Sequence, residues 1–172
     1  NRLEQNEELK KYCEKIYYYS RNKSIKNFFF SKKPFLVQSR YSNILIKNLT
    51  FLEYPIFFDG LQSVAAGFHP ALYKRKKYVR IHNVESQYIR NLAKSESNLL
   101  KKAGLTLEAY KYKLFEKKID AFNCVFTISH NDTLFYKKYN IHTQTLSPFH
   151  GNKQVSSQLG SGTFVLHHGN YN

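Results

Sequence analysis

The sequence lacks several features that usually narrow the class of a protein. It contains no methionine, no tryptophan and only two cysteines, Cys13 and Cys124. The cysteines lie far apart in apolar surroundings and form no C-x-x-C pair, so we expect two buried thiols in a reducing cytoplasm. Because methionine is missing even at position 1, we do not expect these 172 residues to be a complete translation product.

Long apolar runs are also absent. No stretch approaches the roughly 18–20 apolar residues of a membrane span, and no secretory signal opens the chain. Hydrophobic residues nevertheless make up 42% of the sequence and aromatic residues 16%, so the chain can bury a core and is not disordered as a whole. Its length suits one large domain, or one domain and a fraction of another.

Acidic residues are scarce relative to basic ones. The chain has 27 Lys and Arg but 12 Asp and Glu, which gives a formal net charge of +15. Such a charge implies an anionic partner, and nucleic acid, an anionic membrane and a phosphorylated ligand all qualify. The charge alone does not choose between them. We expect a cytoplasmic protein, with peripheral attachment to the inner membrane face as an open alternative.

Short apolar segments alternate with helical patterns along the chain. Strands are predicted at 14–19, 55–58, 78–81, 124–128 and 143–146. Helices are predicted at 5–12, within 35–49, at 86–94, 107–123 and from 129 to about 139, with a small helix or turn over 64–72. This alternation predicts an α/β fold: a Rossmann-like, mostly parallel sheet with helices on both faces.

The longest predicted helix, over 107–123, carries an apolar stripe that we expect to face the core. Its members are Leu107, Tyr110, Leu114, Phe115, Ile119 and Phe122. Beyond it, Ser129 and Asp132 have the S-x-x-D spacing of a capping box, which predicts the start of the next helix.

Polar side chains gather where two predicted strands end. Arg80, His82, Asn83 and Glu85 join the strand at 78–81 to the following helix, and Asp59 follows the strand at 55–58. Ligands of open α/β sheets bind outside the carboxyl ends of the strands, and a helix start favours anions. These five residues are therefore candidates for ligand contact.

Each candidate also has a simpler structural interpretation. His82 can form a local hydrogen bond at the strand end, and Glu85 can serve the dipole of the helix that it begins. Arg80 can pair with Glu85, and Asp59 with Gly60 can form a plain turn. The spacing of the remaining histidines matches no metal-binding pattern, so we expect no metal.

Several segments together resemble the acceptor half of bacterial family 4 glycosyltransferases. They are "SRYS", "PIFFDGLQ", "VRIHNVESQYIRNLAKSE", "TISHNDTLFYKKY", "LSPFHGN" and "GTFVLHHGNYN", in that order. The resemblance covers roughly residues 8–172. It implies the N-terminal domain of a GT-B fold, with an acceptor-binding domain at 1–150, an interdomain linker at 151–162 and the first strand of a truncated donor-binding domain at 163–172.

The family transfers a sugar from a nucleotide-sugar with retention of configuration. The resemblance implies a catalytic role for His82, facing an interdomain cleft. Arg80, Asn83, Glu85, Asp59 and His150 are then candidates for substrate binding. The implied acceptor is a glycan or lipid-linked sugar, and no cofactor is expected beyond the nucleotide-sugar substrate. The chain lacks most of the donor domain, so we expect it to be inactive alone.

Two further classes remain as alternatives: a basic nucleic-acid-binding module, and a non-catalytic carbohydrate- or partner-binding domain. No nucleic-acid-binding motif supports the first. Residues 21–35 interleave lysines and an arginine with Phe28, Phe29, Phe30 and Phe35. They can bind an anionic membrane, stack on nucleic acid, or form a solvated loop whose phenylalanines anchor it to the core.

Overall fold

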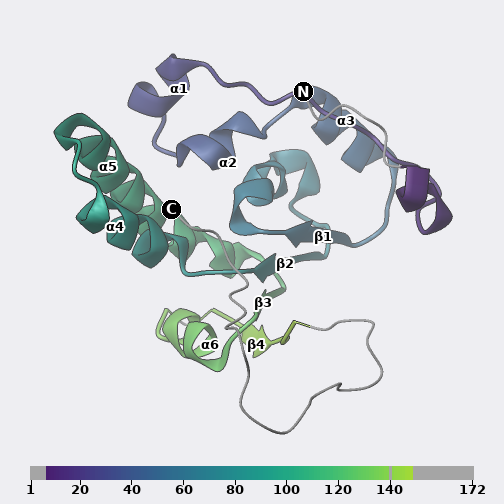
Figure 1. Ribbon diagram of the computed structural model, residues 1–172. Coiled ribbons are helices and arrows are strands. Elements are labelled where there is room, and N and C mark those ends of the chain that lie inside the picture. The colour runs from purple at the N-terminus through teal and green to yellow at the C-terminus, as the bar shows by residue number, and fades with distance from the viewer. Residues whose placement is uncertain (1–6, 140, 149–172) are drawn as a thin grey trace, which may run out of the picture.

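The computed structural model describes residues 7–139 and 141–148 (Figure 1). His150, the expected linker at 151–162 and the expected strand at 163–172 lie outside the described residues. Four strands form one sheet in the order β1-β2-β3-β4, and all three neighbouring pairs are parallel. They are β1 (Ile56–Asp59), β2 (Lys77–Ile81), β3 (Cys124–Thr127) and β4 (Thr143–Thr145). The predicted α/β, Rossmann-like class is confirmed.

Helices precede β1 and fill the connections between the four strands. The α-helices are α1 (Ile25–Phe30), α2 (Phe35–Ser39), α3 (Asn43–Phe51), α4 (Glu85–Ser95), α5 (Leu99–Glu116) and α6 (His130–Lys137). Short 3-10 helices are η1 (Glu7–Lys11), η2 (Leu61–Phe68), η3 (Pro70–Leu72) and η4 (Lys117–Ala121). Among the residues that the structure describes, no helix combines the length and apolar character that crossing a bilayer requires.

The core lies on one face of the sheet. Phe58, Val79 and Val125 are neighbours in register and are buried. Phe122, just after η4, packs edge-on against Phe58, with ring centroids 5.5 Å apart. Right-handed crossovers that all step in one direction place their helices on the same face, and the described helices pack on this one.

The opposite face carries a row of rings. Phe126 lies 6.2 Å from Phe57 and 6.4 Å from Tyr78 between ring centroids, and Phe57 is 54% exposed. Side chains alternate between the faces of a strand, which separates Phe57 from the buried Phe58. The prediction placed helices on both faces, whereas the described helices cover the core face.

The strand predicted at 14–19 is wrong. These residues form irregular chain, and Tyr17 and Tyr18 are 53% and 43% exposed. The run of tyrosines favours extended backbone, but a strand is stable only beside a partner strand, and the described sheet does not include this segment.

The prediction that both thiols are buried is wrong for Cys13, which is exposed, and confirmed for Cys124, which is buried in β3.

The helix predicted at 107–123 begins earlier and ends earlier. α5 starts at Leu99, where the side chain of Asn98 accepts a hydrogen bond from the Lys101 N–H, and it gives way to η4 after Glu116. The first half of the predicted stripe is wrong, because Leu107, Tyr110 and Leu114 are 39%, 59% and 46% exposed. The second half is confirmed. The buried members are Phe115, Ile119 and Phe122.

The true buried face of α5 is disguised by its composition. Glu108, Tyr112 and Glu116 follow one another at four-residue spacing and are all buried. Residues four apart share a helix face, but two of these three are glutamates. A search for an apolar stripe therefore selects the wrong face.

Candidate functional site

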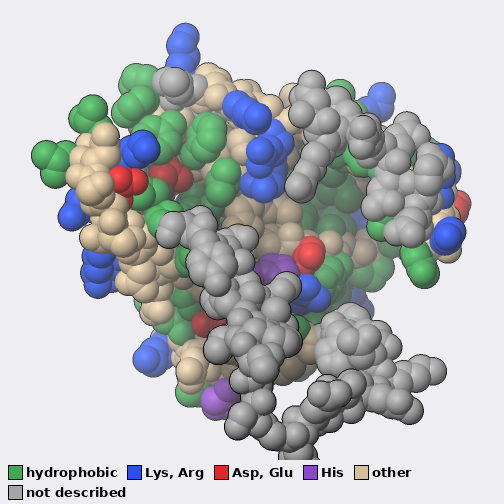
Figure 2. Space-filling model, viewed as in Figure 1, with side chains coloured by type: hydrophobic (Ala, Val, Ile, Leu, Met, Phe, Trp, Pro, Cys, Tyr) green, Lys and Arg blue, Asp and Glu red, His purple; other side chains and the backbone are tan. Residues whose placement is uncertain are grey.

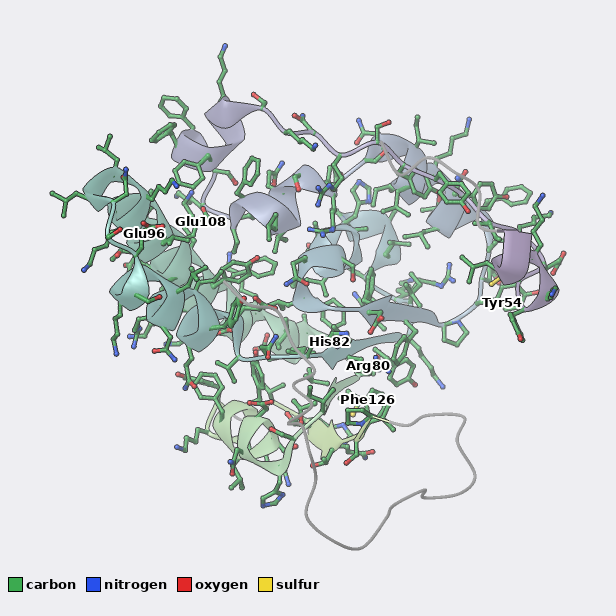
Figure 3. The ribbon with its side chains drawn as sticks, viewed as in Figure 1. Tyr54, Arg80, His82, Glu96, Glu108 and Phe126 are labelled. Atoms are coloured by element: carbon green, nitrogen blue, oxygen red, sulfur yellow. The ribbon has the colours of Figure 1, made fainter. Side chains whose placement is uncertain are left out.

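Three of the predicted site residues meet at the carboxyl edge of the sheet, and Figure 3 labels two of them, Arg80 and His82. Asp59, the last residue of β1, is the register neighbour of Arg80 in β2, so their side chains share a face of the sheet. The Asp59 Oδ1 atom lies 3.2 Å from Arg80 Nε and 2.9 Å from His82 Nε2. We call Asp59, Arg80 and His82 the edge cluster.

The edge cluster is open to solvent. The side chains of Asp59, His82 and Arg80 are 63%, 40% and 27% exposed, respectively. The Arg80–Asp59 contact has ion-pair distance without hydrogen-bond geometry, because the buried Nε atom makes no hydrogen bond within the described residues. The partner of Arg80 is Asp59, so the alternative pairing of Arg80 with Glu85 is wrong.

Gly60 gives the edge cluster its backbone turn. Its φ of +83° lies in a region that L side chains rarely adopt, and its N–H donates to the Arg80 carbonyl at 2.8 Å. A Cβ at this position would lie 2.8 Å from Gln62 Oε1 but only in ordinary contact with His82, 3.9 Å from Cδ2. The glycine therefore lets the chain leave β1 sharply without a clash with Gln62.

Glu85 and Asn83, the other two candidates that follow β2, differ in their exposure to solvent. Glu85 is the buried first residue of α4, and its Oε1 accepts a hydrogen bond from Gln62 Nε2 at 2.7 Å. Burial raises the pKa of Glu85, and the Gln62 hydrogen bond and the charges of His82 and Arg40 oppose that rise. Asn83 is exposed on the turn between β2 and α4. Of these two, only Asn83 is accessible to a ligand.

Sequence reasoning missed the most buried carboxylate near the site. Glu116, at the end of α5, is 1% exposed. It accepts hydrogen bonds from the Ser86 N–H at 3.0 Å, from Ser86 Oγ at 2.6 Å and from the Tyr136 hydroxyl at 3.3 Å. Burial raises the pKa of Glu116, and these hydrogen bonds from Ser86 and Tyr136 oppose that rise.

Glu116 changes the expectation for the start of α4. Free N–H groups at a helix start attract anions, and the sequence predicted such a preference here. In the structure the Ser86 N–H, in the first turn of α4, already donates to the protein's own Glu116 carboxylate. The four-residue spacing of Glu108, Tyr112 and Glu116 was the signal that could have revealed this buried glutamate.

Two further sequence predictions concern the helix cap at Ser129 and the use of a metal. Ser129 caps α6 as predicted, since its Oγ accepts the Asp132 N–H at 3.2 Å. Within residues 7–139 and 141–148, no group of three or more His, Cys, Asp or Glu side chains is placed to hold a metal ion. The expectation that no metal is used stays a prediction.

The fold and the edge cluster together define a Rossmann-like α/β domain with a polar, accessible site where β1 and β2 end. A family cannot be assigned by comparison, because no protein-family model, no curated protein and no solved structure matches the chain.

Proposed function

We propose that this chain is the acceptor-side domain of a retaining glycosyltransferase, which moves a sugar from a nucleotide-sugar to a glycan or lipid-linked acceptor. The observation that carries the proposal is the edge cluster: Asp59 Oδ1 lies 2.9 Å from His82 Nε2 and 3.2 Å from Arg80 Nε. The cluster lies at the carboxyl ends of parallel strands, where open α/β sheets bind their ligands.

The contacts of His82 suit hydrogen bonding to a substrate. When Nε2–H of the neutral ring donates to Asp59, the other ring nitrogen, Nδ1, is an acceptor. The half-exposed imidazole can then accept a hydrogen bond from a sugar hydroxyl. Asp59 acts as a positioning residue in this scheme, because it fixes the orientation of the ring. The resemblance noted in the sequence supports the same role for His82.

Two neighbouring residues, Arg80 and Asn83, are also placed to contact the substrates. Arg80 places a permanent positive charge beside the edge, where it can attract the phosphates of the donor. The exposed Asn83 can orient the acceptor. We assign Glu85 no contact with substrate, because its side chain is buried and accepts a hydrogen bond from Gln62. That hydrogen bond joins the start of α4 to η2.

The proposal is tested in the full-length protein that contains these residues. A hydrogen bond between neutral groups is worth about 0.5–1.5 kcal/mol, so His82→Ala should lower the rate of sugar transfer roughly 2- to 13-fold. The melting temperature should change little. The matched control is His142→Ala, because His142 is exposed and directly precedes β4, at the opposite, amino edge of the parallel sheet.

Two outcomes would overturn the proposal. One is a His82→Ala protein that melts earlier but transfers sugar at the normal rate per folded molecule, which would make His82 structural. The other is transfer by the purified 172-residue chain at enzymatic rates, because we propose that a separate domain must bind the donor diphosphate.

A further inference from the structure

Large apolar side chains are exposed together on two segments far apart in the sequence. Phe29 and Phe30 of α1 are 63% and 86% exposed, and Leu99 and Leu100 at the start of α5 are 79% and 86% exposed. We call these four residues the tip surface, because Leu99 and Leu100 lie at the end of the α4–α5 hairpin. Figure 2 shows hydrophobic side chains gathered over this end of the molecule, with basic and acidic side chains among them.

A groove of about 600 Å³ lies between Phe28 of α1 and the α4–α5 hairpin, and Leu100 of the tip surface lines it. The rest of its lining is Leu92, Gly104 and Leu105 together with the charged side chains of Glu96, Lys101 and Glu108. A Cβ at Gly104 would lie 3.4 Å from the Phe28 Cζ, an ordinary van der Waals contact, so α1 packs directly against α5 at this point. The groove opens beside the exposed leucines, so it can admit an acyl chain that approaches from that side.

The exposed phenylalanines are held outward by a fixed anchor. Lys111 of α5 donates to the Phe28 carbonyl oxygen and lies 5.0 Å from the centroid of the Phe28 ring. Glu108 accepts the Phe35 N–H at 2.7 Å. The loop expected over residues 21–35 is partly wrong, because Ile25–Phe30 form α1. Phe28 and Phe35 are partly buried, whereas Phe29 and Phe30 are exposed and do not anchor the segment.

The hairpin behind the tip surface presents positive charge. Three of its four glutamates, Glu85, Glu108 and Glu116, are buried. The fourth, Glu96, is partly exposed and lines the groove. The exposed cations of the hairpin are Arg90, Lys94, Lys101, Lys102 and Lys113. The cations outnumber the single accessible carboxylate, so the surface of the hairpin carries a net positive charge.

We propose that the tip surface docks on an anionic lipid bilayer, with its apolar side chains among the acyl chains and the hairpin lysines against the headgroups. Phe29 and Phe30 could stack on bases, but the equally exposed Leu99 and Leu100 could not, whereas Leu and Phe both partition into a lipid interface. The combination therefore favours lipid over nucleic acid. This inference does not depend on the proposed sugar transfer, since the tip surface and the edge cluster share no residue.

Vesicle binding by the 172-residue chain tests the proposal. Vesicles of phosphatidylcholine mixed with phosphatidylglycerol should bind the chain, and the binding should weaken with salt, since the Debye length falls to about 3 Å at 1 M. Leu99→Ser with Leu100→Ser should weaken binding at least about tenfold, because each leucine loses its apolar burial. Lys101→Gln should weaken it about fivefold.

A fluorescent reporter separates docking from general stickiness. The chain contains no tryptophan, so Leu100→Trp provides a single reporter whose emission should shift to the blue on anionic vesicles. Phe51→Trp on α3 is the matched control, because Phe51 is also 86% exposed but lies outside the tip surface, and its emission should not shift.

The same measurements can overturn the proposal. Equal binding to vesicles of pure phosphatidylcholine would show that charge does not contribute to binding. Equal emission shifts from both tryptophans would show that the tip surface is not the site of contact. Single-stranded DNA that binds more tightly than anionic vesicles, and loses that binding in the Leu99→Ser, Leu100→Ser variant, would assign the surface to nucleic acid instead.

Discussion

Two carboxylates near the carboxyl edge of the sheet, Glu116 and Asp59, differ in their burial and in their contacts. Glu116 is 1% exposed and accepts hydrogen bonds from both donors of Ser86 and from Tyr136. The side chain of Asp59 is 63% exposed and lies beside Arg80 and His82. Both carboxylates join two elements of the fold, but solvent reaches only the second.

The difference in burial predicts a difference in role. A buried acceptor that loses its donors, or donors that lose their acceptor, cost the full desolvation energy. An exposed ion pair contributes little, because water competes for both partners. We therefore expect Glu116 to stabilise the fold, and we expect the edge cluster to be free to exchange its contacts for those of a ligand.

The largest expected effect is the loss of the buried carboxylate. Glu116→Ala leaves Ser86 N–H, Ser86 Oγ and the Tyr136 hydroxyl without their acceptor, which should cost about 3 kcal/mol or more of unfolding free energy. Urea denaturation measures it. The control is Glu53→Ala, because Glu53 is exposed. A loss no greater than that of the control would erase the contrast between the two carboxylates.

The turn beside the edge cluster contains one residue, Gly60, whose substitution should destabilise the protein through backbone strain. Gly60 has φ +83°, so Gly60→Ala should destabilise the protein by roughly 1–3 kcal/mol through strain. Gly104→Ala is the matched control within α5, where alanine is favoured over glycine by up to about 1 kcal/mol. Opposite signs in thermal unfolding are expected, and a neutral Gly60→Ala would show that the turn is not strained.

The pH dependence of stability sharpens the comparison further. Burial raises the pKa of Glu116 in the folded protein, so the folded state keeps a proton that the unfolded chain has already released. Stability should therefore fall as the pH rises from the ordinary carboxyl pKa through the raised one, and the loss persists above it. Glu116→Gln should flatten this decline.

The flattening should be partial rather than complete. Burial also raises the pKa of Glu85, so the Glu116→Gln protein keeps the contribution of that second carboxyl. Unfolding free energies measured over a pH series, for both proteins, give the comparison. An unchanged slope in the variant would show that Glu116 titrates as it does in the unfolded chain.

The sequence predicted the exposed site better than the buried one. Asp59 and Arg80 lie at the ends of short strands and His82 just beyond one, and parallel strands bring such ends to one edge, so their meeting was open to inference. Their pairing was not, because it depends on the register of β1 and β2: Arg80 adjoins Asp59 rather than Glu85. Parallel register is set by tertiary packing and leaves no local signal.

The buried carboxylate was hidden for a related reason. Periodicity analysis counts glutamate as polar and assigns it to the solvent face, but Glu108 and Glu116 are buried beside Tyr112. Their burial is stable because donors from distant segments satisfy them: Phe35 N–H for Glu108, and Ser86 and Tyr136 for Glu116. Those partners are visible only in the folded structure.

The smallest expected effect belongs to Asp59. Asp59→Asn keeps an oxygen acceptor for His82 and removes the negative charge beside Arg80. Since exposed ion pairs contribute about 0–1 kcal/mol, the unfolding free energy should change by less than about 1 kcal/mol, well below the effect of Glu116→Ala. In the full-length protein, the same variant should lower sugar transfer, because a neutral amide orients the His82 ring less firmly. If Asp59→Asn instead destabilises the fold as much as Glu116→Ala while transfer per folded molecule is unchanged, the edge cluster is a structural contact and the contrast between the two carboxylates disappears.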